Sequence, residues 1–280
     1  MGYDKWGKLW MNMRFVISGV ILAVPVALIA LVGGFVALFL SGRIAPPPEP
    51  TPAPPTILVP RGELPEGPVG LREWVRYVGE GYGAMSCGFM FHLDNGDVVG
   101  ATVAHTHSLG DPNHPLERIA LGIPGREDLL AEFDTLQGHP GRPRSGDDMR
   151  VDYILMHADQ EVDPRYILNP DPRGAPQPGE RVALLSGLGG GDGPDGPRML
   201  SGTVQSVSDE AVWVLMDDMF MAGSMSGSPF VSHYTGRVVG MLIAGTVRGK
   251  QMLLAVHPIG SLLGLAERAT EFSKMSEFVR

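Results

Sequence analysis

Short apolar segments separated by turn-forming residues dominate the chain from Trp74 onward. Short apolar segments bounded by turn residues are typical of β-strands. Apolar residues return at helical spacing in 259–270, which we expect to form a carboxy-terminal helix. The pattern therefore predicts an all-β domain closed by one helix. The expected extended segments are 75–78, 88–93, 98–105, 119–122, 128–133, 150–156, 178–185, 199–206, 211–216, 230–232, 237–245 and 252–257.

A different pattern occupies the amino-terminal end. Residues 15–40 form a run of 26 residues without a charged side chain. At ~1.5 Å per residue, a helix of this length spans ~39 Å, enough to cross a hydrocarbon core of ~30 Å. A cleaved signal peptide is the alternative, but its apolar region is shorter and small residues follow it at the cut site. The run predicts an uncleaved transmembrane anchor.

Basic residues are distributed unevenly around this run. Three of the four Lys/Arg of residues 1–60 precede it, and Arg43 alone follows it. The positive-inside rule then leaves the amino terminus in the cytoplasm and the rest outside, in a periplasm or at a cell surface. Gly19, Gly33 and Gly34 are suited to close packing against a helix of a membrane-protein partner.

Composition separates the anchor from the exported domain. Residues 1–43 hold the cytoplasmic end and the anchor, and 44–66 form a Pro-rich linker, of which we expect 45–55 to run as polyproline II. The 38 glycines and 25 prolines of the chain favour many short strands over long helices. Cys87 is the only cysteine, which excludes an intramolecular disulfide framework.

The exported part is acidic. The chain has 22 Lys/Arg and 31 Asp/Glu, of which residues 1–60 hold four and two, so residues 61–280 carry 18 against 29. Phosphate binding needs a basic surface, so this balance excludes nucleic acid as an expected partner. An acidic body is also repelled by an anionic membrane, which suits a domain held away from it by a linker.

Three short motifs carry candidate chemistry. Ser226 lies within Gly223–Pro229 (GSMSGSP), where small residues permit a tight turn that exposes a hydroxyl and aims backbone N–H groups at a carbonyl oxygen. A Ser/Gly-rich surface loop is the plainer interpretation of the heptapeptide alone. His105 ends the extended segment 98–105, and Asp152 begins an apolar run.

The order of these motifs resembles that of the trypsin/chymotrypsin-like serine proteases, in their bacterial form. His105 and Asp152 are 47 residues apart and Asp152 and Ser226 are 74 apart. The resemblance implies two six-stranded antiparallel β-barrels, the first over 67–165 and the second, with the carboxy-terminal helix, over 166–280.

The resemblance also implies roles for individual residues and a polypeptide as substrate. Ser226 would be the nucleophile, His105 the general base and Asp152 the residue that orients the histidine. The N–H groups of Ser224 and Ser226 would form the oxyanion hole. No cofactor and no metal is implied. The substrate-binding residues would be Phe220, Ile243, Ala244 and Gly245.

Two departures from the family pattern leave alternatives open. Ser224 stands where the family has glycine, and Ile154 stands where alanine is usual and would crowd the site. A catalytically inactive protease-like domain, serving as a binding or assembly subunit of a membrane complex, is therefore the main alternative. A metal-dependent hydrolase that uses the cluster of His105, His107 and His114 is another.

Overall fold

The computed structural model of the chain describes residues 53, 55–126, 128–144, 148–188 and 198–279. The membrane anchor expected at 15–40 and most of the Pro-rich linker lie outside these ranges. Within them, no helix is both long and apolar enough to cross a membrane.

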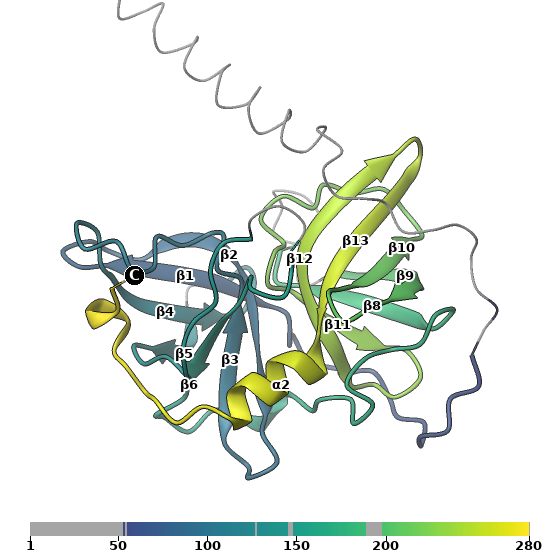
Figure 1. Ribbon diagram of the computed structural model, residues 1–280, viewed down its shortest axis with the longest axis horizontal. Coiled ribbons are helices and arrows are strands. Elements are labelled where there is room, and N and C mark those ends of the chain that lie inside the picture. The colour runs from purple at the N-terminus through teal and green to yellow at the C-terminus, as the bar shows by residue number, and fades with distance from the viewer. Residues whose placement is uncertain (1–52, 54, 127, 145–147, 189–197, 280) are drawn as a thin grey trace, which may run out of the picture. The chain divides into compact units, whose positions relative to one another are not determined.

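The first half of the domain is a twisted sheet whose strand order is β5-β4-β1-β2-β3-β6 (Figure 1). A short strand, β7, follows a 3-10 helix, η1, and pairs in parallel with β2. The strands are β1 (Leu71–Tyr77), β2 (Gly83–His92), β3 (Val98–Thr102), β4 (Leu116–Gly122), β5 (Leu129–Phe133), β6 (Ile154–His157) and β7 (Ile167–Leu168), and η1 is Pro164–Tyr166.

This first sheet corrects the expectation of two six-stranded antiparallel barrels. It is an open half-barrel with one parallel pairing rather than a closed antiparallel barrel. Regular pairing stops at Phe133 because the chain leaves β5 there, and Leu136 joins Met156 of β6 through a single bridge. The core inside the sheet is nevertheless continuous and includes the fully buried Leu121.

The second half is a closed barrel with the strand order β10-β13-β12-β11-β8-β9, as expected. Its inner face is filled by apolar side chains, including Val214 and Phe230, because inward positions alternate with outward ones along each strand. The strands are β8 (Arg181–Ser186), β9 (Arg198–Val207), β10 (Val212–Met216), β11 (Pro229–Ser232), β12 (Val238–Arg248) and β13 (Gln251–Pro258).

The chain ends by returning to the first sheet. Helix α2 (Ile259–Glu267) follows β13 directly and stops three residues before the expected end at 270 (Figure 1). The segment beyond it pairs with the residues that follow β5, and the Leu136 N–H donates to the Ser273 carbonyl at 2.8 Å. Met275, in the 3-10 helix η2 (Met275–Glu277), is 1 % exposed and completes the first core.

The segment before β1 makes the opposite connection. The Gly62 N–H donates to the Tyr234 carbonyl at 2.9 Å, on the turn after β11. A Cβ at Gly236 would overlap the carbonyl oxygen of Glu63, so backbone packs directly on backbone there. Residues 61–70 therefore lie against the second barrel before the chain enters the first sheet.

Candidate active site

The first two predicted catalytic residues meet at one end of the first sheet. His105 follows β3 and Asp152 precedes β6, and these two strands are antiparallel neighbours with Thr102 opposite Ile154. The end of one strand therefore lies beside the start of the other. His105 Nδ1 is 2.7 Å from Asp152 Oδ2, as a base oriented by a carboxylate requires.

The Asp152 carboxylate is held by more than the imidazole. Its other oxygen accepts from the backbone N–H groups of Ala104 at 2.9 Å and His105 at 3.0 Å. The Asp152 side chain has no solvent exposure, whereas 27 % of the His105 side chain is exposed. The buried carboxylate thus orients the imidazole through Nδ1, while part of the imidazole remains accessible to solvent.

Ser226 lies in the second of two successive turns. Met225 N–H donates to the Ala222 carbonyl at 3.1 Å, and Ser228 N–H donates to the Met225 carbonyl at 3.0 Å. In each turn the third residue has positive φ, namely Ser224 at 62° and Gly227 at 87°. Negative φ followed by positive φ defines type II turns, whose third position normally requires glycine. Ser226 is the partly exposed second residue of the later turn.

Strand β2 brings this pair of turns to the histidine. The Cys87 N–H donates to the Ser226 carbonyl at 3.0 Å. A Cβ at Gly227 would overlap the Cys87 carbonyl oxygen, to which the Thr102 hydroxyl also donates at 2.9 Å. Ser226 therefore packs against the β2–β3 pair, whose chain continues to His105. Among the described residues, no hydrogen bond joins the Ser226 hydroxyl to the His105 ring.

The predicted oxyanion residue Ser224 occupies an unusual conformation. It is the only described residue other than glycine with positive φ. The Cys87 thiol donates to its carbonyl at 3.5 Å. Burial raises the pKa of Cys87 to about 11, so the thiol keeps its proton at neutral pH and remains a donor. The departure from glycine noted in the sequence thus falls at a position where glycine would be unstrained.

Strand β12 pairs with the turn that carries Ser226 (225–228), which we call the nucleophile turn. Gly227 N–H donates to the Leu242 carbonyl at 2.8 Å, and Leu242 N–H donates to the Ser228 carbonyl at 2.9 Å. The predicted substrate-binding residues 243–245 come next along β12, where it pairs with β13 but no longer with β11. Among the described residues, no strand pairs with this edge of β12 beyond Leu242, beside Ser226. Phe220, the other predicted substrate-binding residue, packs partly buried against the core of the second barrel.

Two sequence-based expectations are not met by the geometry. Ile154 is fully buried in the core of the first sheet and does not crowd the cleft, because its side chain lies on the inner face of β6. The three clustered histidines contact three different carboxylates: His105 contacts Asp152, His107 contacts Glu73 and His114 contacts Glu80. They do not converge on one metal position.

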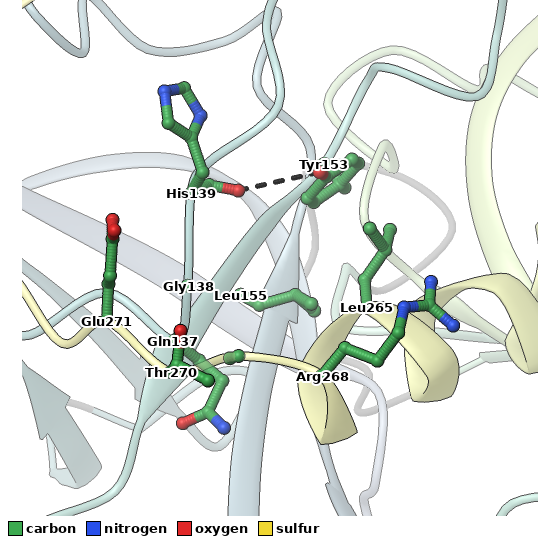
Figure 2. A pocket seen from close by; sticks show the side chains of 10 residues that line it. Gln137, Gly138, His139, Tyr153, Leu155, Leu265, Arg268, Thr270 and Glu271 are labelled. Carbon is green, nitrogen blue, oxygen red and sulfur yellow. Dashed lines mark hydrogen bonds between the residues drawn. The ribbon is translucent and has the colours of Figure 1, made fainter.

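A separate pocket of about 410 Å³ lies between the end of α2 and the first sheet (Figure 2). The Tyr153 hydroxyl donates to the His139 carbonyl at 3.5 Å across one wall. The lining includes none of His105, Asp152 and Ser226, so this pocket is not the candidate active site. An extended peptide needs an edge strand and a shallow groove rather than a closed cavity.

Four residues that contact or adjoin the candidate site were not predicted from the sequence. Cys87 and Thr102 bond to the nucleophile turn or to each other, and Glu73 and His107 form a buried pair next to them. One signal was present in the sequence. Along β1 the inner positions are Leu71, Glu73, Val75 and Tyr77, so an acidic side chain interrupts an otherwise mostly apolar face.

Comparison with known proteins identifies the fold. No model of a known protein family matches the chain, and no curated protein matches its sequence. Among solved structures, a thermostable serine protease, AL20, from an extremophilic microorganism is 12% identical, with a TM-score of 0.50 over 72% of this chain and 97% of that one.

Two further solved structures are similar at lower scores. Kallikrein-related peptidase 10 is 17% identical, with a TM-score of 0.49 over 71% of this chain and 93% of that one. Catalytically active tobacco etch virus protease complexed with product is 14% identical, with a TM-score of 0.48 over 78% of this chain and 86% of that one. The fold shared with AL20 is the chymotrypsin-like protease fold.

Proposed function

We propose that the chain is a membrane-anchored, extracytoplasmic serine endopeptidase. One observation carries the proposal. A buried carboxylate, Asp152, lies 2.7 Å from the imidazole of His105, and the turn with the partly exposed Ser226 packs on the strand pair that leads to that imidazole. In a protease fold, this arrangement supports acyl transfer to a serine hydroxyl.

In the proposed reaction the Ser226 oxygen attacks the carbonyl carbon of a peptide bond. His105 Nε2 takes the hydroxyl proton and then gives it to the departing amine, while Nδ1–H stays bonded to Asp152. Water then attacks the acyl-enzyme, again with His105 as base, and releases the carboxylic acid. The N–H groups of Ser224 and Ser226 stabilise the oxyanion, by ~3 kcal/mol for each donor.

The proposed substrate is an extended polypeptide. Residues 243–245 lie on an edge of β12 that pairs with no other described strand, and a peptide backbone adds there as a further antiparallel strand. Phe220 is apolar and stands where an acidic residue would select Lys or Arg. We therefore propose a preference for small or apolar side chains next to the cleaved bond.

The proposed location depends on residues 15–40, whose apolar run is long enough to span a bilayer. Alkaline carbonate extraction of membranes containing the full chain tests it. The chain is expected to stay with the membrane pellet, and a variant that lacks 15–40 is expected in the supernatant. Recovery of the full chain in the supernatant would contradict the anchor.

A fluorophosphonate probe tests the enzymatic proposal. It reacts with a serine hydroxyl only where a base and an oxyanion hole activate that hydroxyl, so the full chain is expected to be labelled. Ser226→Ala should abolish the labelling and His105→Ala should reduce it more than a hundredfold. Ser206→Ala, at a partly exposed serine on β9, is the matched control and should leave it unchanged.

The alternative function is an inactive protease-like binding or assembly subunit. The positive φ of Ser224 favours it, because relaxation of this turn would move an oxyanion donor out of place. Labelling of the wild type that Ser226→Ala abolishes supports the enzyme. Folded wild type that the probe never labels supports the binding subunit.

A further inference from the structure

A second acid–histidine pair lies buried next to the candidate active site. His107 Nε2 is 3.1 Å from Glu73 Oε1, and neither side chain has any solvent exposure. The mechanism proposed above uses neither residue. His107 is nevertheless only two residues beyond His105, on the same loop.

Two hydroxyl groups extend the pair into a cluster. The Ser86 hydroxyl donates a short hydrogen bond to the second oxygen of Glu73 and lies 3.4 Å from the Thr106 hydroxyl. We call Glu73, Ser86, Thr106 and His107 the buried brace. Its members come from β1, from β2 and from the two residues immediately after His105.

The carboxylate of the buried brace is charged at neutral pH. Burial alone would raise the pKa of Glu73, but His107 and the nearby hydroxyls outweigh burial and hold the pKa below its usual range. Such a buried charge requires its partners in fixed positions. The loop after His105 is therefore held to β1 by an electrostatic contact between Glu73 Oε1 and His107 Nε2, atoms that make no hydrogen bond among the described residues.

Strand β2 links the buried brace to the nucleophile turn. Ser86 belongs to the buried brace, and the next residue, Cys87, bonds to the carbonyls of both Ser226 and Ser224. Ser86 and Cys87 thus contact both parts of the candidate site. The Ser86 side chain lies against the loop that follows His105, and the Cys87 backbone N–H and thiol bond to the turn that carries Ser226.

Stability alone does not account for the buried brace. Replacing a buried ion pair by apolar side chains of similar volume is often neutral or stabilising. The neighbouring inner positions of β1, Leu71 and Val75, are apolar, so a third apolar side chain would suit this face. A buried carboxylate facing an imidazole instead specifies one arrangement of the loop.

We propose that Glu73 and His107 are positioning residues for the candidate active site. They fix the loop that carries His105 against β2, and through β2 they fix its imidazole relative to Ser226. They touch neither the substrate nor the reacting atoms. The inference rests on the proposed protease function for its kinetic consequence, but its structural consequence is independent of catalysis.

Glu73→Gln tests the inference, because it keeps the size of the side chain and removes its charge. We expect kcat for a peptide substrate, and the rate of fluorophosphonate labelling, to fall about ten- to a hundredfold with little change in KM. Glu117→Gln, in the partly exposed Arg76–Glu117 pair on β1 and β4, is the matched control and should change neither. Adding His107→Asn to Glu73→Gln should cost little more, since both act as one unit.

A spectroscopic measurement separates this inference from the proposed function. The His105 Nδ1 proton bonded to Asp152 gives a downfield ¹H NMR resonance, assigned by its loss in Asp152→Asn. We expect it to shift or broaden in Glu73→Gln and to stay unchanged in Glu117→Gln. If the wild type resists the probe but this resonance responds, the proposed function fails and the positioning role stands.

A wild-type kcat together with an unchanged resonance in Glu73→Gln would overturn the inference. If Glu73→Gln does not fold, Ser86→Ala is the second test variant. It removes only the hydroxyl that bonds to Glu73 and lies beside Thr106, and its kcat and its His105 resonance are measured in the same way. Loss of thermal stability with normal kcat and an unchanged resonance would assign the buried brace a purely structural role, and would also overturn it.

Discussion

Ser224 adopts a backbone angle that an L-residue reaches only with strain. Its φ of 62° lies in the left-handed region, and this conformation costs ~1–2 kcal/mol for a residue with a Cβ. At Gly223, one position earlier, an added Cβ would have no neighbour within 4 Å. In this turn Gly223 occupies a position that does not require glycine. The strained position is occupied by Ser224, a proposed oxyanion donor.

Ser224→Gly is expected to relieve this strain. The variant should gain about 1 kcal/mol in the free energy of unfolding, and its fluorophosphonate labelling should be several-fold faster, because the turn that presents the donor becomes the relaxed one. Denaturant unfolding and labelling rates measure the two effects. Ser206→Gly on β9 is the control for a glycine substitution elsewhere. Slower labelling of Ser224→Gly would show that the serine side chain itself supports the turn.

At the residue scale the candidate site was only partly predictable. His105, Asp152 and Ser226 were found because each sits in a local motif, and the structure brings the first two together. Glu73 was not found, because its partner His107 is 34 residues away and no local pattern reports that contact. The φ of Ser224 likewise depends on Cys87 and β2, which hold the turn from outside.

At the element scale, most strands could be predicted because short apolar segments are separated by turn-forming residues along the chain. β2 begins at Gly83, five residues before the predicted 88, since its first residues are exposed and do not form an apolar run. β7 is two residues long and was hidden within the Pro-rich crossing between the halves. The return of 271–275 to the first sheet depends on backbone pairing, which has no signature in the sequence.

Substitution of Gly227 tests whether close packing on β2 holds the nucleophile turn in place. Gly227→Ala places a Cβ onto the Cys87 carbonyl oxygen, so the turn must move off β2. We expect fluorophosphonate labelling to fall more than a hundredfold while the domain remains folded by circular dichroism. Gly223→Ala is the matched control, since a Cβ there has no neighbour within 4 Å, and should label normally. Equal labelling of the two variants would contradict the arrangement of β2 and the turn.

At the scale of the whole molecule, buried titratable groups join the two halves and set the response to acid. His257 of β13 is fully buried, and its Nε2 lies 3.0 Å from the carbonyl of Arg150, in the loop before Asp152. Burial lowers the pKa of His257 below its usual 6.5. Asp171 also has a lowered pKa, because Arg173 and Thr235 outweigh the opposing effect of burial.

The domain is therefore expected to lose stability in two steps as the pH falls. Below pH 6.5 the unfolded chain protonates His257 more readily than the folded chain, at a cost of at most ~1.4 kcal/mol per pH unit. A second loss follows below about pH 4, as Asp171 becomes protonated in the unfolded chain before the folded one. Denaturant unfolding measured from pH 7.5 to 3.5 follows both steps.

His257→Gln should weaken the first step, to which His233 also contributes because burial lowers its pKa, and leave the second. His92→Gln, at a partly exposed histidine that ends β2, should keep both. If His257→Gln shows the same decline between pH 6.5 and 5 as the wild type, another group controls that step.

The segment before β1 determines where a pull on the amino-terminal side would be felt. Tension entering at residue 61 meets the Gly62–Tyr234 hydrogen bond and the close packing of Gly236 on Glu63 before it reaches β1. A tethered chain would thus transmit mechanical load first to the turn after β11 in the second barrel. The loop of His105 would be shielded from that load as long as this contact holds.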